Sequence, residues 1–377
     1  METGGIEVLH QLAEQLMRNN IETYMFYYGD HVDLTGEDPT PLEYKKYGAK
    51  IVDRYLDSEE SVLIVPETKV FLKELCVKGQ AVVWWLSVDG YLRSVETAKE
   101  AENFQFNGVL HFVQSCYAEH FVKDTLGAKD CNYLSDYISE VIYSYADKNR
   151  ERTTRQPICF YNPKKGYDRV SRLIQKAPHI NWVPICGLSA EGVAQLLCSG
   201  MVYIDFGFHP GKDRIPREAA YCGCVILTNR QGSAAYAEDV AIPEKYKVTD
   251  DETDEQIIEK ITELINHYEE KKLEFAPYIE KIRHEKEVFE LETLKMIEVL
   301  KEAMPLSREN IKEKQTCIEY LDMMKKQMEA VIKRNEYMQK LIQEENYHEC
   351  VKCLLNENYM NINFNMEIWE LARYLAE

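Results

Sequence analysis

One stretch of this chain, residues 201–228, limits the choice of fold more than any other. It reads MVYIDFGFHPGKDRIPREAAYCGCVILT, with an apolar strand pattern, a break at Gly207, a helix that opens with Ile215-Pro216, and a second apolar strand after Gly223. Proline suits the first turn of a helix, because the N–H group that it lacks would be unpaired there. Strand, loop, helix and strand in this order predict a βαβ unit, and hence an α/β protein with a parallel sheet.

The loop of this unit carries His209, Lys212 and Arg214. It follows the carboxyl end of a strand, where open α/β sheets bind their ligands. It also precedes a helix N-terminus, whose free N–H groups and positive dipole end favour a phosphate group. Loop lysines and arginines are more often simply solvated. At this position in the fold, we interpret Lys212 and Arg214 as anion-binding residues.

Composition excludes several classes of protein. The chain has 377 residues, enough for two domains and an appendage, and a formal net charge of −19. That charge argues against nucleic acid as a general partner, because nucleic-acid binding needs a positive field. The 11 cysteines show no disulfide-framework spacing, which fits a reducing cytoplasm. No run of about 18 apolar residues is present, so peripheral attachment is the form of membrane association left open.

The segment PREAAYCGCVILT resembles the C-terminal part of the donor site of GT-B glycosyltransferases, where a Glu-x7-Glu pattern precedes an alanine, a glycine turn and an apolar strand. Glu218 matches the second glutamate, but Pro210 stands at the first. The variant HPGKDRIPREAA is similar to one found in bacterial surface-polysaccharide glycosyltransferases. The resemblance implies two Rossmann-like domains that face one cleft, with a C-terminal helical extension, and a bond from Glu218 to the ribose of a nucleotide.

Two further segments resemble GT-B elements that face this cleft. Gly4-Gly5-Ile6-Glu7 is similar to a turn that normally follows the first strand, and Gly4 and Gly5 would approach the donor. Only three residues precede Gly4, so either the chain is truncated or its N-terminal sheet lacks the usual first strand. In the turn Asn162–Gly166, Lys165 matches a lysine that reaches the donor diphosphate.

The rest of the chain alternates strand patterns with helical periods, as a parallel α/β sheet requires. The predicted strands include 22–28, 61–66, 81–87, 158–161 and 181–185, and the predicted helices include 4–18, 68–78, 114–125 and 191–198. His111 follows a short apolar step, and the resemblance implies that it contacts the donor sugar or deprotonates an acceptor hydroxyl; a structural histidine is the alternative. Asp89 is a weaker candidate, because aspartate before glycine usually forms a turn.

These patterns predict three regions. Residues 1–150 form an N-terminal, acceptor-side domain, residues 151–303 form the nucleotide-sugar-binding domain, and a polar run at 144–157 links them. Residues 304–377 form a helical tail, in which apolar residues from 321 to 342 alternate in steps of three and four. With Asn335 at an a position, this tail predicts a short coiled coil and a homodimer; packing on its own domain is the alternative.

The sequence therefore favours a cytoplasmic glycosyltransferase of surface-polysaccharide or glycan biosynthesis, and it leaves peripheral attachment to the inner face of the membrane open. A nucleotide-sugar is the donor, a glycan or lipid-linked hydroxyl is the acceptor, and Lys165, Lys212 and Arg214 hold the diphosphate. The sequence contains no Asp-x-Asp metal motif, so no metal and no separate cofactor is expected. Two alternatives remain: a nucleotide-sugar epimerase of the same fold, and a non-catalytic GT-B-like partner subunit.

Overall fold

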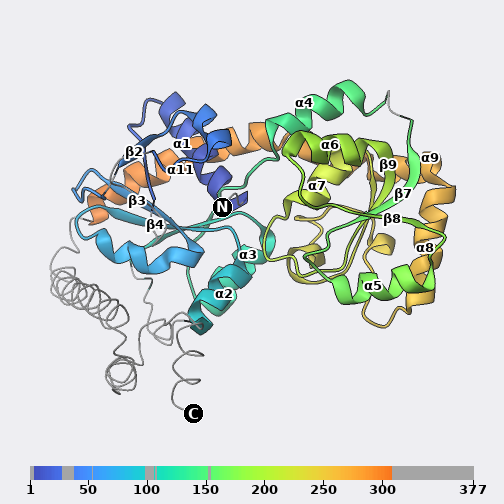
Figure 1. Cartoon of the computed structure of the whole chain (residues 1–377). Helices are drawn as coiled ribbons and strands as arrows, with labels where there is room; N and C mark the ends of the chain where they lie inside the picture. The colour runs from blue at the N-terminus through green and yellow to red at the C-terminus, as the bar shows by residue number, and fades with distance from the viewer. Residues whose placement is uncertain are drawn as a thin grey trace, which may run out of the picture.

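The computed structural model describes residues 4–27, 38–52, 54–97, 106, 108–151 and 154–307. They form two α/β domains that lie side by side, with α4 (Glu140–Asn149) on the C-terminal domain and α11 (Glu285–Ser307) running back along the N-terminal domain (Figure 1). The predicted coiled coil at 321–342, with Asn335, lies outside the described residues. None of the described helices combines the length and apolar character needed to cross a bilayer.

The C-terminal domain is built on a parallel sheet in the order β10-β9-β7-β8, with four strands among the described residues. Its strands are β7 (Gln156–Tyr161), β8 (Asn181–Pro184), β9 (Gly200–Asp205) and β10 (Val225–Thr228). The chain places β8 on one side of β7 and then returns to place β9 on the other side. The predicted βαβ unit is confirmed: β9 and β10 pair in parallel, with α7 (Arg214–Tyr221) between them in sequence.

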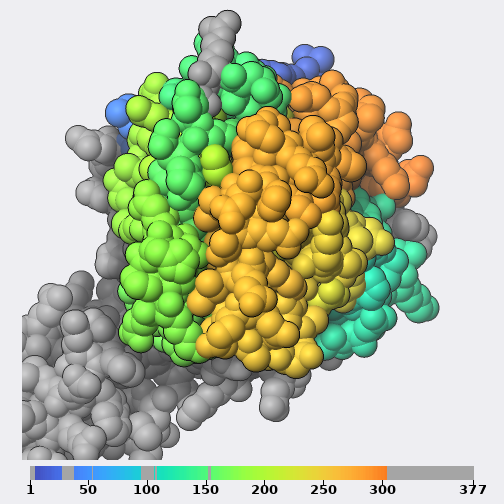
Figure 2. Space-filling view, turned by 90° about the vertical axis from the view of Figure 1, so that its right-hand side faces the viewer, coloured from blue at the N-terminus to red at the C-terminus, as the bar shows by residue number. Residues whose placement is uncertain are grey.

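Helices cover both faces of this sheet. They are α4, α5 (Tyr167–Lys176), α6 (Ala190–Ser199), α7, α8 (Asp254–Asn266), α9 (Tyr268–Lys271) and α10 (Ala276–Arg283). The start of α8 is set by a capping box between Thr253 and Gln256, and its residues Ile257, Ile261 and Leu264 are buried at the spacing of one helix face. Figure 2 shows this orange helical segment packed directly against the green residues of the same domain.

The N-terminal domain has a parallel sheet in the order β3-β4-β5-β6. Its strands are β3 (Val62–Pro66), β4 (Gln80–Trp85), β5 (Leu110–Val113) and β6 (Asn132–Tyr133). Successive side chains of a strand point to opposite faces, so Val82 and Trp84 enter one buried cluster while Val83 and Trp85 enter another. All four are fully buried, which makes β4 the centre of the domain.

The first strands of this domain stand apart from that sheet. β1 (Tyr24–Phe26) and β2 (Lys50–Val52) pair with each other in a separate parallel sheet. Among residues 4–27, no strand precedes α1 (Gly4–Arg18). The other helical elements are the 3₁₀ helices Leu42–Tyr47 and Glu67–Leu75, α2 (Val88–Thr97), α3 (Cys116–His120), and a π-helical turn at Phe121–Thr125.

The chain crosses between the domains twice. After β6 it passes into α4, whose Ile142 and Ala146 are buried in the C-terminal core. At the other end, Phe289 and Met296 of α11 pack into the N-terminal core beside Trp84. The run 144–157, predicted as the interdomain linker, therefore begins inside a helix of the C-terminal domain, because α4 has an apolar face that its polar composition concealed.

Candidate functional site

The strand order defines where a ligand can bind. In an open parallel sheet, ligands bind at the carboxyl ends of the strands where neighbouring connections leave in opposite directions. In the C-terminal domain this switch point lies between β7 and β9, which are hydrogen-bonded neighbours. The loop after β7 contains Lys165, and the loop after β9 leads to Arg214 at the start of α7. Topology therefore brings together two of the cations selected from the sequence.

Close backbone packing holds the two loops together. Gly166 has a φ of +62°, and a Cβ atom there would lie 2.5 Å from the carbonyl group of Phe206. A Cβ atom on Gly207 would overlap the side chain of Lys165. Larger residues at either position would push the loops apart. The two glycines therefore fix the place of Lys165.

Lys165 ends a line of ionisable groups that starts inside the domain. Its Nζ lies 2.9 Å and 2.8 Å from the two carboxylate oxygens of Asp213. His209 is fully buried, with Nδ1 2.9 Å from Asp213 and Nε2 3.9 Å from Asp205. Burial opposes ionisation of Asp213, but His209 and Lys165 together hold the pKa of that carboxyl below its ordinary value. Asp213 is therefore the carboxylate that orients Lys165.

The same residues, Asp205, His209 and Asp213, bring potential ligand atoms within 4.8 Å of one another, as a metal site requires. Their contacts do not favour a metal. Lys165 Nζ contacts both oxygens of Asp213, and Asp205 accepts hydrogen bonds from the hydroxyl of Tyr203 and the backbone of Gly207. A cation would have to displace Lys165. The group acts as an ion-pair network in this structure.

Arg214 reaches from the first turn of α7 to the N-terminal domain. Its guanidinium donates to Glu7 of α1 at 2.6 Å, and Glu7 also accepts a bond of 2.8 Å from the hydroxyl of Tyr47. Burial alone would raise the pKa of Glu7, but Arg214, Tyr47 and Lys46 hold it below its ordinary value. Arg214 and Glu7 therefore form an ion pair across the seam between the domains.

Lys212 belongs to a deeper network. Its Nζ lies 3.0 Å from the carboxylate of Glu285 and donates to the backbone carbonyl of Asp136 at 3.0 Å. Arg217, which is 1% exposed, bridges the same two acidic residues at 2.9 Å and 2.8 Å. The side chain of Lys212 is 10% exposed, whereas those of Lys165 and Arg214 are 30% and 20% exposed. Lys165 and Arg214 are therefore the more accessible of the predicted cations.

Glu218 and Pro210, the two positions of the Glu-x7-Glu pattern, lie in different surroundings. Glu218 is half-buried on α7, and burial raises its pKa although Arg214 and Arg217 oppose the shift. The carbonyl of Pro210 accepts a hydrogen bond of 2.8 Å from the backbone of Val88 in the N-terminal domain. Pro210 thus takes part in the contact between domains, while Glu218 lies close enough to Arg214 for the two charges to interact.

The glycines of the predicted N-terminal turn, Gly4 and Gly5, form the first turn of α1. Gly5 is exposed, and a Cβ atom there would meet only the Leu86 side chain, at 4.0 Å. The seam is tighter at Gly211, where a Cβ atom would overlap the carbonyl oxygen of Leu86. Close backbone approach between the domains therefore depends on Gly211 rather than on Gly5.

His111 is not at the carboxyl edge, where the sequence prediction placed it. It is the second residue of β5, 4% exposed, and its Nδ1 accepts a hydrogen bond of 3.0 Å from the indole of Trp85. Its ring also packs against that of Phe106, with centroids 5.4 Å apart. Burial lowers the pKa of His111 to about 4. The alternating register of β5 turns this side chain into an aromatic layer of the core, so it lies apart from the cations.

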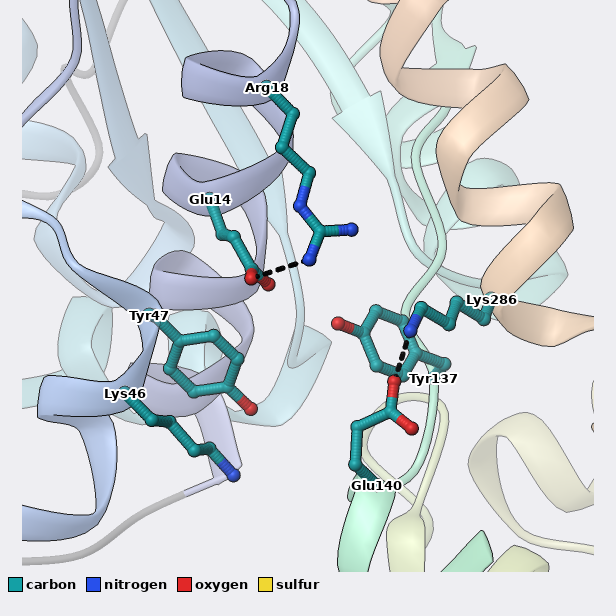
Figure 3. A pocket seen from close by; sticks show the side chains of 7 residues that line it. All are labelled: Glu14, Arg18, Lys46, Tyr47, Tyr137, Glu140 and Lys286. Carbon is teal, nitrogen blue, oxygen red and sulfur yellow. Dashed lines mark hydrogen bonds and ion pairs between the residues drawn. The ribbon is translucent and has the colours of Figure 1, made fainter.

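A hollow of about 320 Å³ opens at the side of the seam near α1 and α11. Figure 3 shows Tyr47 and Lys46 on one wall and Tyr137, Glu140 and Lys286 on the other. Within this hollow Lys286 pairs with Glu140, and on α1 Arg18 pairs with Glu14. The hollow adjoins the Arg214–Glu7 ion pair through Tyr47, but none of the predicted cations lines it.

Sequence reasoning missed the acidic partners of the cations. Glu7 stands out in the sequence through its place in a turn, and no pattern in the sequence analysis points to Asp136, Asp213 or Glu285. Their partners come from distant parts of the chain, with Glu7 and Arg214 separated by 207 positions. For Asp213 a local signal existed, since it lies four residues after His209 at the start of a helix.

Comparison with known proteins identifies the fold. No protein-family model and no curated protein matches the chain. The sucrose-phosphate synthase structure from Thermosynechococcus elongatus is similar, with a TM-score of 0.54 and 12% identity, over 80% of this chain and 94% of that one. HepE from Anabaena, solved with UDP-glucose, has a TM-score of 0.52 and 9% identity, over 79% of this chain and 97% of that one. The chain therefore has the GT-B glycosyltransferase fold, as predicted.

Proposed function

We propose that this protein is a glycosyltransferase that moves a sugar from a nucleotide-sugar donor to an acceptor hydroxyl, in surface-polysaccharide or glycan biosynthesis. The observation that carries the proposal is the position of Lys165 and Arg214 on the two loops that flank the switch point, with Arg214 at the N-terminus of α7. Both side chains keep exposed surface, and cations at a helix N-terminus are suited to a diphosphate. The UDP-glucose bound to the similarly folded HepE supports a nucleotide-sugar as the donor.

The proposed chemistry is displacement at the anomeric carbon of the donor sugar. Its difficult part is the negative charge that develops on the departing diphosphate. Asp213 and Glu7 fix the positions of Lys165 and Arg214, and the departing diphosphate would take these two cations over from the carboxylates. Glu218, half-buried next to Arg214, is the proposed partner of the nucleotide ribose. Lys212 supports the site from its buried network.

A second candidate function is a non-catalytic GT-B-like subunit that supports a partner enzyme. The contacts at the seam favour it in one respect, because Lys165, Lys212 and Arg214 are each paired with a carboxylate of the chain itself. A donor diphosphate would have to compete with these carboxylates. Pro210, in place of the first glutamate of the pattern, points the same way.

A panel of nucleotide-sugars separates the candidates, including the epimerase alternative. A transferase releases nucleotide in the presence of an acceptor and forms a glycoside. An epimerase converts the sugar of the donor without any acceptor. A supporting subunit does neither. Glycan and lipid-linked acceptors should be tested both free and in vesicles, because we propose a cytoplasmic protein and peripheral attachment is the form of membrane association left open.

Arg214→Ala tests the donor site directly. Loss of a charge-assisted hydrogen bond should weaken nucleoside diphosphate binding about 10- to 150-fold, equivalent to roughly 1.5–3 kcal/mol. Titration calorimetry measures the effect. Arg230→Ala is the matched control, because Arg230 lies in the same domain but pairs with Glu244 at 42% side-chain exposure. Equal affinities for the two variants would remove Arg214 from the site.

A further inference from the structure

The hollow of about 320 Å³ at the side of the seam has no part in the proposed reaction. One of its walls belongs to the N-terminal domain and carries side chains of α1 and of the 3₁₀ helix Leu42–Tyr47. The other wall is formed where the chain crosses between the domains: Tyr137 lies just before α4, Glu140 begins that helix, and Lys286 is the second residue of α11. A molecule in this hollow would therefore touch the N-terminal domain and both crossing segments.

Tyr137 presents an unused polar group to this hollow. Its side chain is 1% exposed, and its hydroxyl points toward the wall that carries Tyr47 (Figure 3). Tyr47 donates to Glu7 at 2.8 Å, whereas the Tyr137 hydroxyl has no hydrogen-bond partner among the residues that the structure describes. A tyrosine hydroxyl inside a protein usually has such a partner. The hydroxyl of Tyr137 is therefore free to bond a ligand in the hollow.

The charged side chains of the hollow leave one cation over. The charged residues that line it are Glu14, Arg18, Lys46, Glu140 and Lys286. The two carboxylates each pair with one cation, as the dashed lines in Figure 3 show. Lys46 is the remaining cation. Its Nζ lies 3.8 Å from Glu7, beyond hydrogen-bond distance, and its side chain is 44% exposed.

These features define the chemistry of an occupant. A volume of about 320 Å³ is at the lower end of the range for small-molecule sites, and it suits one sugar ring with a small charged group. Of the seven described residues that line the hollow, five are charged and two are tyrosines, so the ligand should be polar. Arg18 uses its Nη2 on Glu14, but a guanidinium has five N–H donors. Arg18 and Lys46 can therefore both bind a phosphate or carboxylate group.

We propose that this hollow binds a small anionic sugar, one that carries a phosphate or a carboxylate group. The anionic group contacts Lys46 and Arg18 on the N-terminal wall, and a hydroxyl of the sugar accepts a hydrogen bond from Tyr137 on the opposite wall. None of the cations assigned to the donor diphosphate lines the hollow. The inference is therefore independent of the proposed glycosyltransferase function.

Titration calorimetry on the full chain tests the site with glucose 6-phosphate and with glucuronate, and uses glucose and inorganic phosphate as reference ligands. We expect at least one of the anionic sugars to bind about tenfold or more tightly than either reference, because it makes both the charged and the hydroxyl contacts. The one that binds identifies the anionic group. Binding should persist in Arg214→Ala, which separates the hollow from the donor cations. If neither anionic sugar binds, if a reference ligand binds as tightly, or if Arg214→Ala abolishes binding, the inference fails.

Two variants test the contacts. Lys46→Gln should weaken binding of the anionic sugar about tenfold, because it removes a charge-assisted hydrogen bond. Lys45→Gln is the matched control: Lys45 lies on the same 3₁₀ helix with 47% side-chain exposure but pairs with Asp38. Tyr137→Phe should weaken binding about three- to tenfold and leave the melting temperature unchanged, since its hydroxyl has no partner among the described residues to lose. Equal affinities for the two lysine variants, or an unchanged affinity for Tyr137→Phe, would overturn the inference.

UDP binding keeps this site apart from the proposed function. Tyr137→Phe should leave the affinity for UDP unchanged, because Tyr137 is not among the residues assigned to the donor. If the wild type binds the anionic sugar but no UDP, the proposed function fails and the site in the hollow stands. If it binds UDP but no anionic sugar, the inference about the hollow fails and the proposed function stands.

Discussion

The two sheets turn their carboxyl edges toward one seam, and the candidate side chains on the two edges differ in the sign of the charge that they can carry. The edge of the C-terminal domain contributes Lys165, Lys212 and Arg214, and the N-terminal side contributes Glu7, Glu67 and Asp89. Two of these groups meet directly, as the ion pair between Arg214 and Glu7 shows. The chain carries a net charge of −19, and each of the three cations is paired with a carboxylate of the chain itself.

The difference extends to ionisation. A phosphate-binding edge needs cations, and the C-terminal edge has them beside a helix N-terminus. On the N-terminal edge, burial raises the pKa of both Glu67 and Asp89, so their surroundings disfavour the ionised form. The seam therefore combines one edge that carries the proposed diphosphate-binding cations with one whose carboxyl groups resist ionisation.

The largest expected effect separates the structural cations of the C-terminal edge from those that bind a ligand. Arg217→Met would leave Asp136 and Glu285 buried with Lys212 as their remaining cation. We expect a loss of about 3–5 kcal/mol in the free energy of unfolding, as for other broken buried ion pairs. Urea denaturation measures it. Arg230→Met, which breaks an exposed pair, should cost less than about 1 kcal/mol; equal losses would show that burial is unimportant here.

The next effect concerns a carboxylate of the N-terminal edge. Glu67 is 2% exposed, and burial raises its pKa from 4.5 to about 7 although backbone N–H groups oppose the shift. Its folded pKa lies above its unfolded pKa, so its contribution to stability is present below pH 4.5 and is lost as the pH rises toward 7. Glu67→Gln keeps an acceptor for the backbone of Leu86 and removes the charge. It should raise the free energy of unfolding at pH 8 by roughly 3 kcal/mol.

Denaturation across pH 4 to 8 checks this expectation. The difference in the free energy of unfolding between Glu67→Gln and the wild type should grow as the pH rises toward 7 and should then level off. Glu60→Gln, at an exposed glutamate in the same domain, should run parallel to the wild type throughout. A constant difference for Glu67→Gln would mean that Glu67 is ionised at its ordinary pKa, and that burial at this edge does not perturb its carboxylates.

The smallest effect tests the direct contact between the edges. Glu7→Gln removes the carboxylate that competes with a diphosphate for Arg214. Gln can still accept a hydrogen bond from Tyr47, so the packing of α1 should survive. We expect nucleoside diphosphate affinity to rise about threefold, because a partly exposed ion pair contributes no more than roughly 1 kcal/mol. Calorimetry at low and high salt measures it. A weaker affinity in this variant would show that Glu7 helps to bind the nucleotide.

Much of the fold follows from local sequence patterns. The apolar strands around Gly207 and Gly223, the proline at the start of α7 and the apolar face of α1 are local features, and each predicted an element that the structure contains. His111 shows where local reasoning fails. The sequence shows a histidine near a strand end, but a strand turns successive side chains to opposite faces, and the register of β5 against β4 directs this one to Trp85.

By itself, the sequence determined which segments become strands and helices and which loops carry the cations, because hydrophobic periodicity and turn chemistry act over a few residues. Only the tertiary structure decided which cations are accessible and which carboxylates face them. Lys212 and Arg214 are two positions apart, yet one is held in a buried network with Glu285 and the other reaches Glu7 across the seam. Such pairings depend on how two domains meet, and contacts between residues more than two hundred positions apart leave no periodic signal in a single chain.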